Sequence, residues 1–232
     1  MSIELVVFDI AGTTMNDEDS VSRCLQESLA AVGVRVAAAN MNRVMGLPKP
    51  EAIRILVSES PGQAELIDRL AEIHDDYVNR SIRFYSTDPS VREVAGAGLA
   101  LRALKKAGIK VALNTGFSRP ITQTILDRLG WSKSPLLDAV ISSDEVPHGR
   151  PRPDMILALM QRLGINDAAR VAKVGDAPAD LLEGRNAGCG LIVGVTEGTH
   201  TREQLEPYPH THLIGSVREL PGIVIPNSAV AS

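Results

Sequence analysis

The stretch that decides the fold lies at the start of the chain: residues 5–14 read LVVFDIAGTT. Its first four residues, Leu5 to Phe8, are apolar and predict a short strand that is buried on both faces. Asp9 follows where the strand ends and a loop of small residues begins. A second carboxylate two positions later would complete an acid/base pair, but that position holds Ala11. The stretch therefore predicts a buried strand carrying a working carboxylate, in a site that is either damaged or obtains its second catalytic group from elsewhere.

Similar short apolar runs recur along the rest of the chain. They lie at residues 111–113, 139–141, 171–174, 191–195 and, more weakly, 212–214. Helical patterns separate several of them, at residues 121–129, 154–163 and 180–186. Strands that alternate with helices predict an α/β fold, here a Rossmann-like, doubly wound parallel sheet with helices on both faces.

About a hundred residues separate the first two runs, too many for one crossover helix. Their pattern is helical throughout, with helices expected at residues 18–32, 50–57 and 63–83 and a break at residues 61–62. The last helix presents one apolar face, formed by Leu66, Leu70, Ile73 and Tyr77. We expect a helical cap, residues 17–86, inserted into a core made of residues 1–16 and 87–232. Residues 86–89 form the expected return linker, and residues 226–232 an expected frayed tail.

The bulk composition narrows the class of protein. The chain has 232 residues, 44% hydrophobic and 22% charged, with a net charge of −4. This balance favours neither nucleic acid nor a membrane surface as a partner. The two cysteines, Cys24 and Cys189, lack the spacing of a disulfide framework or a thiolate zinc site. The absence of a leader pattern or long apolar run leads us to expect a soluble cytoplasmic protein acting on a small molecule.

Polar residues follow four of the apolar runs in succession. They are Asp9, Thr115-Gly116, Arg150, and Asp176 with Asp180. Each alone has an ordinary explanation, such as a turn, a helix cap or a solvated loop cation. Ligands of doubly wound sheets bind at the carboxyl ends of the strands, however, so these residues converge on one edge. Taken in order, they indicate a site.

The combination fits phosphoryl chemistry. Carboxylates gathered at one edge repel each other unless a hard cation such as Mg²⁺ binds among them. We expect Asp9 and Asp176 to hold the ion with help from a backbone carbonyl. Thr115, nearby backbone N–H groups and Arg150 would bind the remaining phosphoryl oxygens. Asp9 could then attack phosphorus and form an aspartyl-phosphate.

This ordered set resembles the haloacid dehalogenase superfamily, over nearly the whole chain from Val7 to about Gly194. Asp9 matches its nucleophile, Thr115 its second motif, Arg150 its third, and Asp176 with Asp180 its fourth. The resemblance implies Mg²⁺ held by Asp9, the Ala11 backbone, Asp176 and Asp180. The implied substrate-binding residues are Gly12, Thr13, Met45, Gly46, Thr115, Gly116 and Arg150.

Two departures from the superfamily pattern point to one of its branches. Phosphatases of the superfamily have an acid at the position of Ala11 and usually a lysine at that of Arg150. Both changes resemble the phosphonatases, which cleave a C–P bond and replace the acid with a cap lysine that forms a Schiff base. Their Met-Gly pair precedes that lysine by three residues, as Met45-Gly46 precedes Lys49. The resemblance implies a Mg²⁺-dependent hydrolase of phosphonoacetaldehyde or a close carbonyl phosphonate, with Asp9, Lys49 and Arg150 catalytic.

Other interpretations stay open at this stage. Lysines are mostly solvated surface residues, so Lys49 could merely bind substrate in a phosphatase for a small phosphate monoester. The phosphonatase pattern also has a His and a Tyr where this chain has Ala52 and Phe117, which leaves the exact substrate open. A non-catalytic binding module is a third hypothesis, against which the intact set of polar residues argues. The resemblance further implies a homodimer through the cap; Leu25, Leu29 and Val32 could form that face or pack inside the cap.

Overall fold

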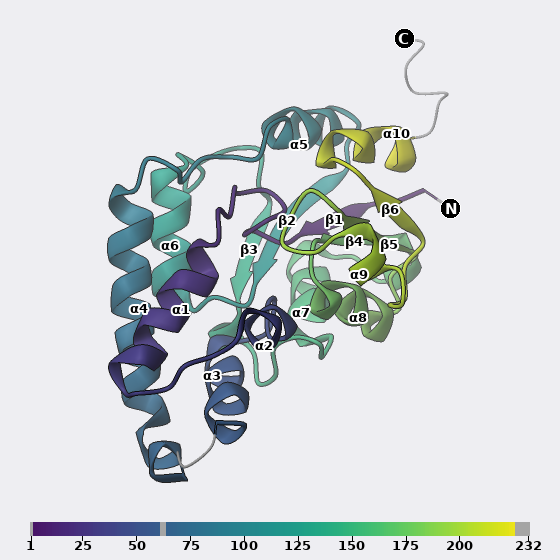
Figure 1. The fold of residues 1–232 in the computed structure, drawn as a ribbon. Coiled ribbons are helices and arrows are strands. Elements are labelled where there is room, and N and C mark those ends of the chain that lie inside the picture. The colour runs from purple at the N-terminus through teal and green to yellow at the C-terminus, as the bar shows by residue number, and fades with distance from the viewer. Residues whose placement is uncertain (1, 61–63, 226–232) are drawn as a thin grey trace.

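The computed structural model describes residues 2–60 and 64–225, and within them the strands form one six-stranded parallel sheet (Figure 1). The strands are β1 (Leu5–Phe8), β2 (Lys110–Thr115), β3 (Ala139–Ser142), β4 (Val171–Gly175), β5 (Leu191–Val195) and β6 (His212–Ile214). Their order is β3-β2-β1-β4-β5-β6, so β1 lies inside the sheet and all its residues are fully buried. The predicted doubly wound fold is confirmed, and each predicted strand lies within one residue or two of its expected bounds.

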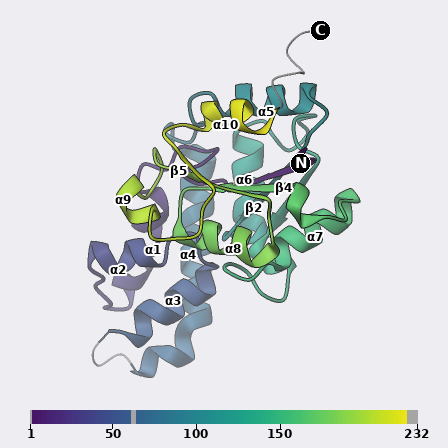
Figure 2. The ribbon, with the colours of Figure 1, turned by 90° about the vertical axis from the view of Figure 1, so that its right-hand side faces the viewer.

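Helices cover both faces of the sheet. The α-helices are α1 (Ser20–Ala31), α2 (Ala38–Arg43), α3 (Lys49–Ser58), α4 (Leu70–Thr87), α5 (Ala97–Lys106), α6 (Arg119–Arg128), α7 (Asp154–Leu163), α8 (Pro178–Ala187), α9 (Arg202–Leu205) and α10 (Leu220–Val224). Short 3-10 helices occur at Ala64–Arg69, Ser143–Glu145, Ala168–Arg170 and Val217–Glu219. In Figure 2, α5 and α10 lie above the strands, and α7 and α8 lie below them.

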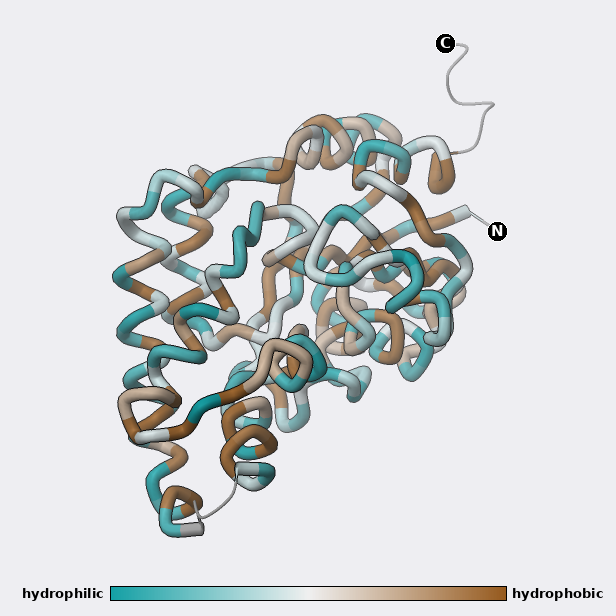
Figure 3. Tube along the Cα trace, in the orientation of Figure 1, coloured by the Kyte–Doolittle hydropathy of each residue, from teal (hydrophilic) through white to brown (hydrophobic). Residues whose placement is uncertain are grey.

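Two apolar cores result from the alternation of side chains along β1. Val6 and Phe8 belong to the core that also contains residues of α5, α6 and α10. Leu5 and Val7 belong to the opposite core, with residues of α7, α8 and α9. Along the outer helices, apolar and polar residues alternate with the helical turn, as Figure 3 shows by colour. The fold therefore places the carboxyl end of β1, and Asp9 with it, at the centre of one sheet edge.

The segment between β1 and α5 is helical, as the sequence predicts for the cap, and α1, α3 and α4 extend together to one side of the sheet (Figure 1). Here α4 packs against α1 and also against α6 of the core. Leu25 and Leu29 are fully buried, so they pack inside this segment and do not form an exposed dimer face.

Some boundaries in this segment differ from expectation. The sequence pattern did not predict α2, a helix of only six residues that carries too few turns for a periodic signal. The expected helix at residues 63–83 is a 3-10 turn followed by α4, and α4 continues to Thr87, so Ser86 and Thr87 are helical where a linker was expected. The expected break at 61–62 and the tail at 226–232 lie outside the described residues. Within the described ranges, no helix combines the length and apolar character that a membrane span requires.

The face that α5 turns toward the sheet can be tested with two leucines of the same helix. Leu101 is 1% exposed and Leu99 is 64% exposed. Leu101→Ala leaves a cavity and should lower the free energy of unfolding by about 2–5 kcal/mol. Leu99→Ala should change it by less than about 0.5 kcal/mol. Urea unfolding of both variants measures the difference, and equal losses would contradict the assignment of this face.

Candidate active site

The polar residues that follow β1, β2 and β4, together with Arg150, meet around one small cavity. It also receives residues from the α2–α3 region of the helical segment. Of the residues singled out in the sequence, the following line it: Asp9, Ala11, Met45, Gly46, Lys49, Thr115, Gly116, Arg150 and Asp176. Gly12, Thr13 and Asp180 lie beside this cavity without lining it. The convergence expected at the carboxyl edge of the sheet is therefore what the fold produces.

Arg150 is the fully buried cation at the centre of the site. Its Nη1 lies 2.7 Å from Oδ1 of Asp9 and 3.0 Å from Oδ1 of Asp180. Its Nε lies 3.0 Å from Oε2 of Glu183, and its Nη2 donates to the side chain and backbone oxygens of Asn114. With every nitrogen engaged, the guanidinium is fixed in orientation and neutralises the carboxylate that sequence reasoning assigns as nucleophile.

Asp176 is held by the loops after β1 and β5. Thr13 donates its hydroxyl to Oδ1, at 3.1 Å, and Thr199 donates both its backbone N–H and its hydroxyl to Oδ2, at 2.7 Å each. Gly12 adopts a φ of +83°, and a Cβ at that position would lie 2.2 Å from Asp176 Oδ2. Thr13 thus holds Asp176, and Gly12 leaves room for it; substrate binding by these two residues stays a prediction.

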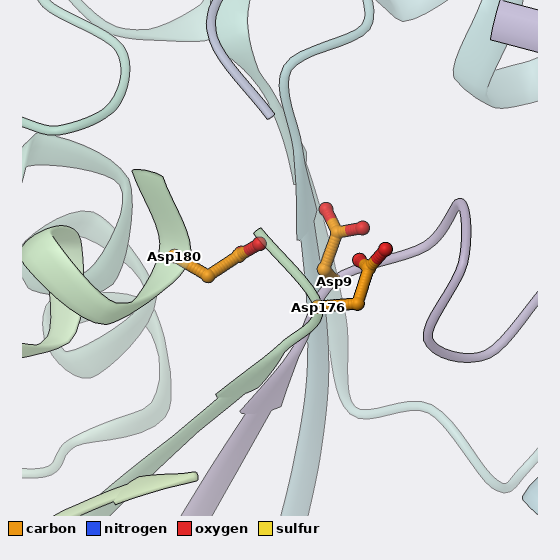
Figure 4. Close-up of side chains that lie close together, drawn as sticks. All are labelled: Asp9, Asp176 and Asp180. Carbon is orange, nitrogen blue, oxygen red and sulfur yellow. The ribbon is translucent and has the colours of Figure 1, made fainter. Parts of the chain in front are cut away.

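Three carboxylates form a group that could hold a cation. Asp9, Asp176 and Asp180 each offer an oxygen, and these oxygens lie within 4.8 Å of one another. Figure 4 shows Asp9 and Asp176 side by side at the strand ends, with Asp180 pointing toward them from α8. All three are buried, and all-oxygen ligand sets suit hard divalent cations.

The local charges fit a cation at this place. Asp9, Asp176, Asp180 and Glu183 are buried with Arg150 and Lys173, so ionised carboxylates exceed these cations by two charges. Burial, followed by the charges of Asp9 and Asp180, raises the pKa of Asp176 to about 7. Burial also raises the pKa of Asp9 to about 6, against the opposing effect of Arg150. These raised pKa values reflect the free-energy cost of keeping buried, neighbouring carboxylates ionised, and one divalent cation bound among them would lower that cost.

Lys49 approaches the same cavity from the first turn of α3. It is 3% exposed, and its Nζ lies 5.5 Å from the ring centre of Phe117 and 3.3 Å from the Leu47 carbonyl oxygen. Burial lowers the pKa of Lys49 to about 8, although the charges of Asp9 and Asp17 oppose the shift. This lysine is therefore not a solvated surface residue.

The helical segment closes over the sheet edge in this conformation. Gly116 follows β2, and a Cβ there would lie 2.6 Å from the Leu47 carbonyl oxygen. Gly46 also packs closely at the start of α8, because a Cβ there would lie 3.0 Å from the Ala177 Cβ and 3.2 Å from the Ala179 Cβ. The cavity that remains has a volume of about 20 Å³, enough for one or two waters. A substrate can therefore enter only after the segment moves away from the edge.

Several residues of the site were not anticipated from the sequence. Lys173 in β4 lies 2.7 Å from Asp180 Oδ1 and 2.8 Å from Asn114 Oδ1, and Glu183 of α8 pairs with Arg150. A lysine inside an apolar strand is a signal for such a buried pair, because strand interiors exclude unpaired charge. Thr199 follows β5, where the strand-end rule also applies. Asp17 lies in an acidic run that is typical of a solvated loop.

Comparison with known proteins identifies the class. A family model for haloacid dehalogenase-like hydrolases matches residues 3–188, and the chain belongs to this family of enzymes. It is 31% identical to a phosphonoacetaldehyde hydrolase of Bacillus cereus over 89% of this chain and 82% of the relative. It is 27% identical to a phosphonoacetaldehyde hydrolase of Bacteroides fragilis, over 94% and 87% of the two chains. The hypothesis of a non-catalytic module is therefore set aside.

Solved structures share the fold. One is a phosphonoacetaldehyde hydrolase-like protein from Oleispira antarctica, with a TM-score of 0.85, 22% identity and coverage of 97% of this chain and 92% of the other. Another is described as a predicted phosphoglycolate phosphatase from Haemophilus somnus, with a TM-score of 0.80, 20% identity and coverage of 96% and 98%. One architecture thus occurs in proteins with different names, so function must be argued from the site.

Cation binding at the carboxylate group can be measured by thermal unfolding. At about 100 times its dissociation constant, Mg²⁺ should raise the melting temperature by about 5–10 °C at pH 8. At pH 5 the shift should be smaller, because Asp9 and Asp176, with pKa values of about 6 and 7, must lose protons to bind the ion. Asp176→Asn should abolish the shift, whereas Glu206→Gln, at an exposed position, should retain it. An unshifted wild-type protein at pH 8 would contradict the assignment.

Proposed function

We propose that the chain is a Mg²⁺-dependent hydrolase that cleaves the C–P bond of phosphonoacetaldehyde or a close carbonyl phosphonate. The observation that carries this proposal is the buried amine of Lys49 in the same cavity as Asp9, beside an Ala11 that offers no acid. The relatives named phosphonoacetaldehyde hydrolase support it, because they match most of this chain.

Cleavage of a C–P bond requires a different catalytic group than cleavage of a phosphate ester does. An ester releases an oxygen that an acid can protonate, whereas a phosphonate must release a carbon. A protonated imine next to that carbon accepts the electron pair of the breaking bond, so an amine replaces the acid. Because its pKa is about 8, about a tenth of Lys49 is neutral at pH 7, against roughly one in 2,500 for an ordinary lysine.

The steps follow from this arrangement. Lys49 Nζ attacks the carbonyl carbon, and water leaves to give an iminium. A carboxylate oxygen of Asp9 then attacks phosphorus, and the C–P electron pair moves to carbon to give an enamine. Water hydrolyses the aspartyl-phosphate to phosphate, while the enamine takes up a proton and the resulting iminium is hydrolysed to acetaldehyde and Lys49.

Other residues bind the phosphonate group. Arg150 presents a fixed guanidinium beside Asp9, and Thr115 and Gly116 line the cavity at the end of β2. Donors at Thr115 and Gly116 match the oxygens that do not take part in the displacement, whereas Arg150, whose N–H groups are all engaged within the protein, contributes its positive charge. When bound by Asp9, the Ala11 backbone, Asp176 and Asp180, Mg²⁺ would supply positive charge against the phosphoryl oxygens. The closed segment would exclude bulk water from the imine.

Trapping the imine tests the proposal. Borohydride added with phosphonoacetaldehyde should reduce the iminium and leave a two-carbon adduct on Lys49, detected by mass spectrometry. Adduct formation should increase with pH up to about 8, because a rising fraction of Lys49 becomes neutral. Lys49→Arg keeps the charge and should give no adduct and no hydrolysis. Lys106→Arg, at an exposed lysine of α5, should behave as the wild type. Absence of the adduct on folded, Mg²⁺-loaded enzyme would contradict the assignment of Lys49 as the Schiff-base residue.

A phosphatase acting on a small phosphate monoester is the second candidate. The arrangement of Asp9, Arg150 and Asp176 supports it, because phosphoryl transfer to Asp9 does not require Lys49. Without an acid at Ala11, such an enzyme should be slow on esters with poor leaving groups.

Replacing Ala11 tests that explanation. Ala11→Asp should raise turnover of an alkyl phosphate by up to about 10²-fold, because the carboxyl group can protonate the leaving oxygen. Turnover of p-nitrophenyl phosphate, whose leaving group needs no proton, should change little. Ala11→Asn has a similar shape without the acid and should give no gain. An unchanged alkyl phosphate rate in Ala11→Asp would contradict this account of Ala11.

A further inference from the structure

Asp17 is a carboxylate of the cavity to which the chemistry above gives no role. It lies in the connection between β1 and α1 and lines the cavity together with Lys49. Its Oδ1 accepts hydrogen bonds from the Ser20 hydroxyl, from the Ser20 N–H at 2.8 Å and from the Val21 N–H at 3.3 Å. Its Oδ2 is buried and has no hydrogen-bond partner among the described residues. The three bonds to Oδ1 fix the carboxylate and leave Oδ2 for another partner.

We propose that Asp17 is the catalytic acid and base of Schiff-base formation, exchanging a proton with Lys49 and with the departing hydroxyl. This inference rests on the proposed C–P hydrolase function and deepens it. A buried carboxylate oxygen without a donor is costly, and the cavity offers Lys49 and the carbonyl oxygen of a substrate as its partners.

The neighbouring groups do not offer an equivalent. Asp9 is engaged by Arg150, and Ala52 and Phe117 carry no exchangeable proton. The Tyr85 hydroxyl contacts the Ser20 hydroxyl at 3.3 Å, but burial raises its pKa well above 10. Tyr77 and Cys24 also face this region, and burial raises the pKa of each.

The pKa values of Asp17 and Lys49 are shifted toward each other. Burial raises the pKa of Asp17, against the effect of its hydrogen bonds and of Lys49, and burial lowers that of Lys49. Proton transfer between two groups is easiest when their pKa values lie close together. The Ser20 hydroxyl, between Asp17 and Tyr85, holds the carboxylate in place for this exchange.

The step balances as follows. Asp17 takes one proton from the Lys49 ammonium, and the neutral amine attacks the carbonyl carbon. A proton passes from nitrogen to the carbonyl oxygen, giving a carbinolamine. Asp17 returns its proton to the hydroxyl group, which leaves as water while the nitrogen lone pair forms the C=N bond. The products are water, a cationic iminium and ionised Asp17, which then faces the iminium charge.

The test compares Asp17→Asn with the wild type in two reactions. The first is the rate of borohydride-trapped adduct on Lys49 with phosphonoacetaldehyde, together with phosphate release. The second is hydrolysis of acetyl phosphate, which needs Asp9 but no imine and no leaving-group acid. Asp17→Asn should slow the first reaction roughly 10²–10⁴-fold and leave the second within about threefold. Asp19→Asn, an exposed neighbour whose φ of +58° asparagine tolerates, is the matched control and should change neither.

The direction of the change separates proton transfer from simple electrostatics. If Asp17 only stabilised the ammonium, its loss would lower the pKa of Lys49 and speed up trapping at pH 7. Faster or unchanged trapping in Asp17→Asn therefore overturns the inference, and so does an equal loss in both reactions, which would indicate a structural role. If the wild-type protein hydrolyses acetyl phosphate but gives no adduct, the proposed function itself is wrong. The role inferred for Asp17 is then wrong as well. Slow trapping with acetyl phosphate hydrolysis retained supports Asp17 as the acid and base.

Discussion

The contact between Arg150 and Asp9 is the interaction on which the site depends. A carboxylate at the end of a buried central strand loses most of its hydration, and a guanidinium at 2.7 Å compensates for part of that loss. Arg150 is itself held by Glu183 and by Asn114, and Lys173 balances Asp180 beside it. Asp180 keeps a lowered pKa because Arg150 and Lys173 outweigh the effect of its burial. Polar side chains from β2, β4 and α8 and the carboxylate after β1 are therefore linked in one network around Arg150.

A second constraint is the approach of the helical segment to the sheet edge. Gly116 lets its backbone meet that of Gly46 and Leu47 where a side chain would collide, and Gly46 packs closely against the Ala177 and Ala179 side chains. This approach brings Lys49 into the cavity and shields it from bulk water, and that burial gives the lysine its lowered pKa. The reactivity proposed for Lys49 thus depends on closure, and entry of substrate depends on its reversal.

Much of the fold and part of the site could be predicted from the sequence, because the strands of a parallel sheet all run in the same direction. Short apolar runs predicted the strands, and the carboxyl ends of such strands meet at one edge, so Asp9, Thr115 and Asp176 had to be neighbours. The buried charge pairs beside the site could not be predicted in this way. Lys173 and Glu183 point at each other from a strand and a helix, and no local pattern records a pairing across that distance.

By itself, the sequence determined the doubly wound sheet and the helical segment between β1 and α5, because these follow from residue type, periodicity and order along the chain, whereas Lys49 was singled out through the family resemblance. Only the tertiary structure decided that Lys49 is buried, that Thr13 donates to Asp176, and that Asp17 keeps one oxygen without a partner among the described residues. The physical reason is that burial and charge pairing depend on which distant segments meet. Asp17 is a solvated loop residue in the unfolded chain. It becomes a titratable group of the cavity once α1, α3 and α4 pack around it.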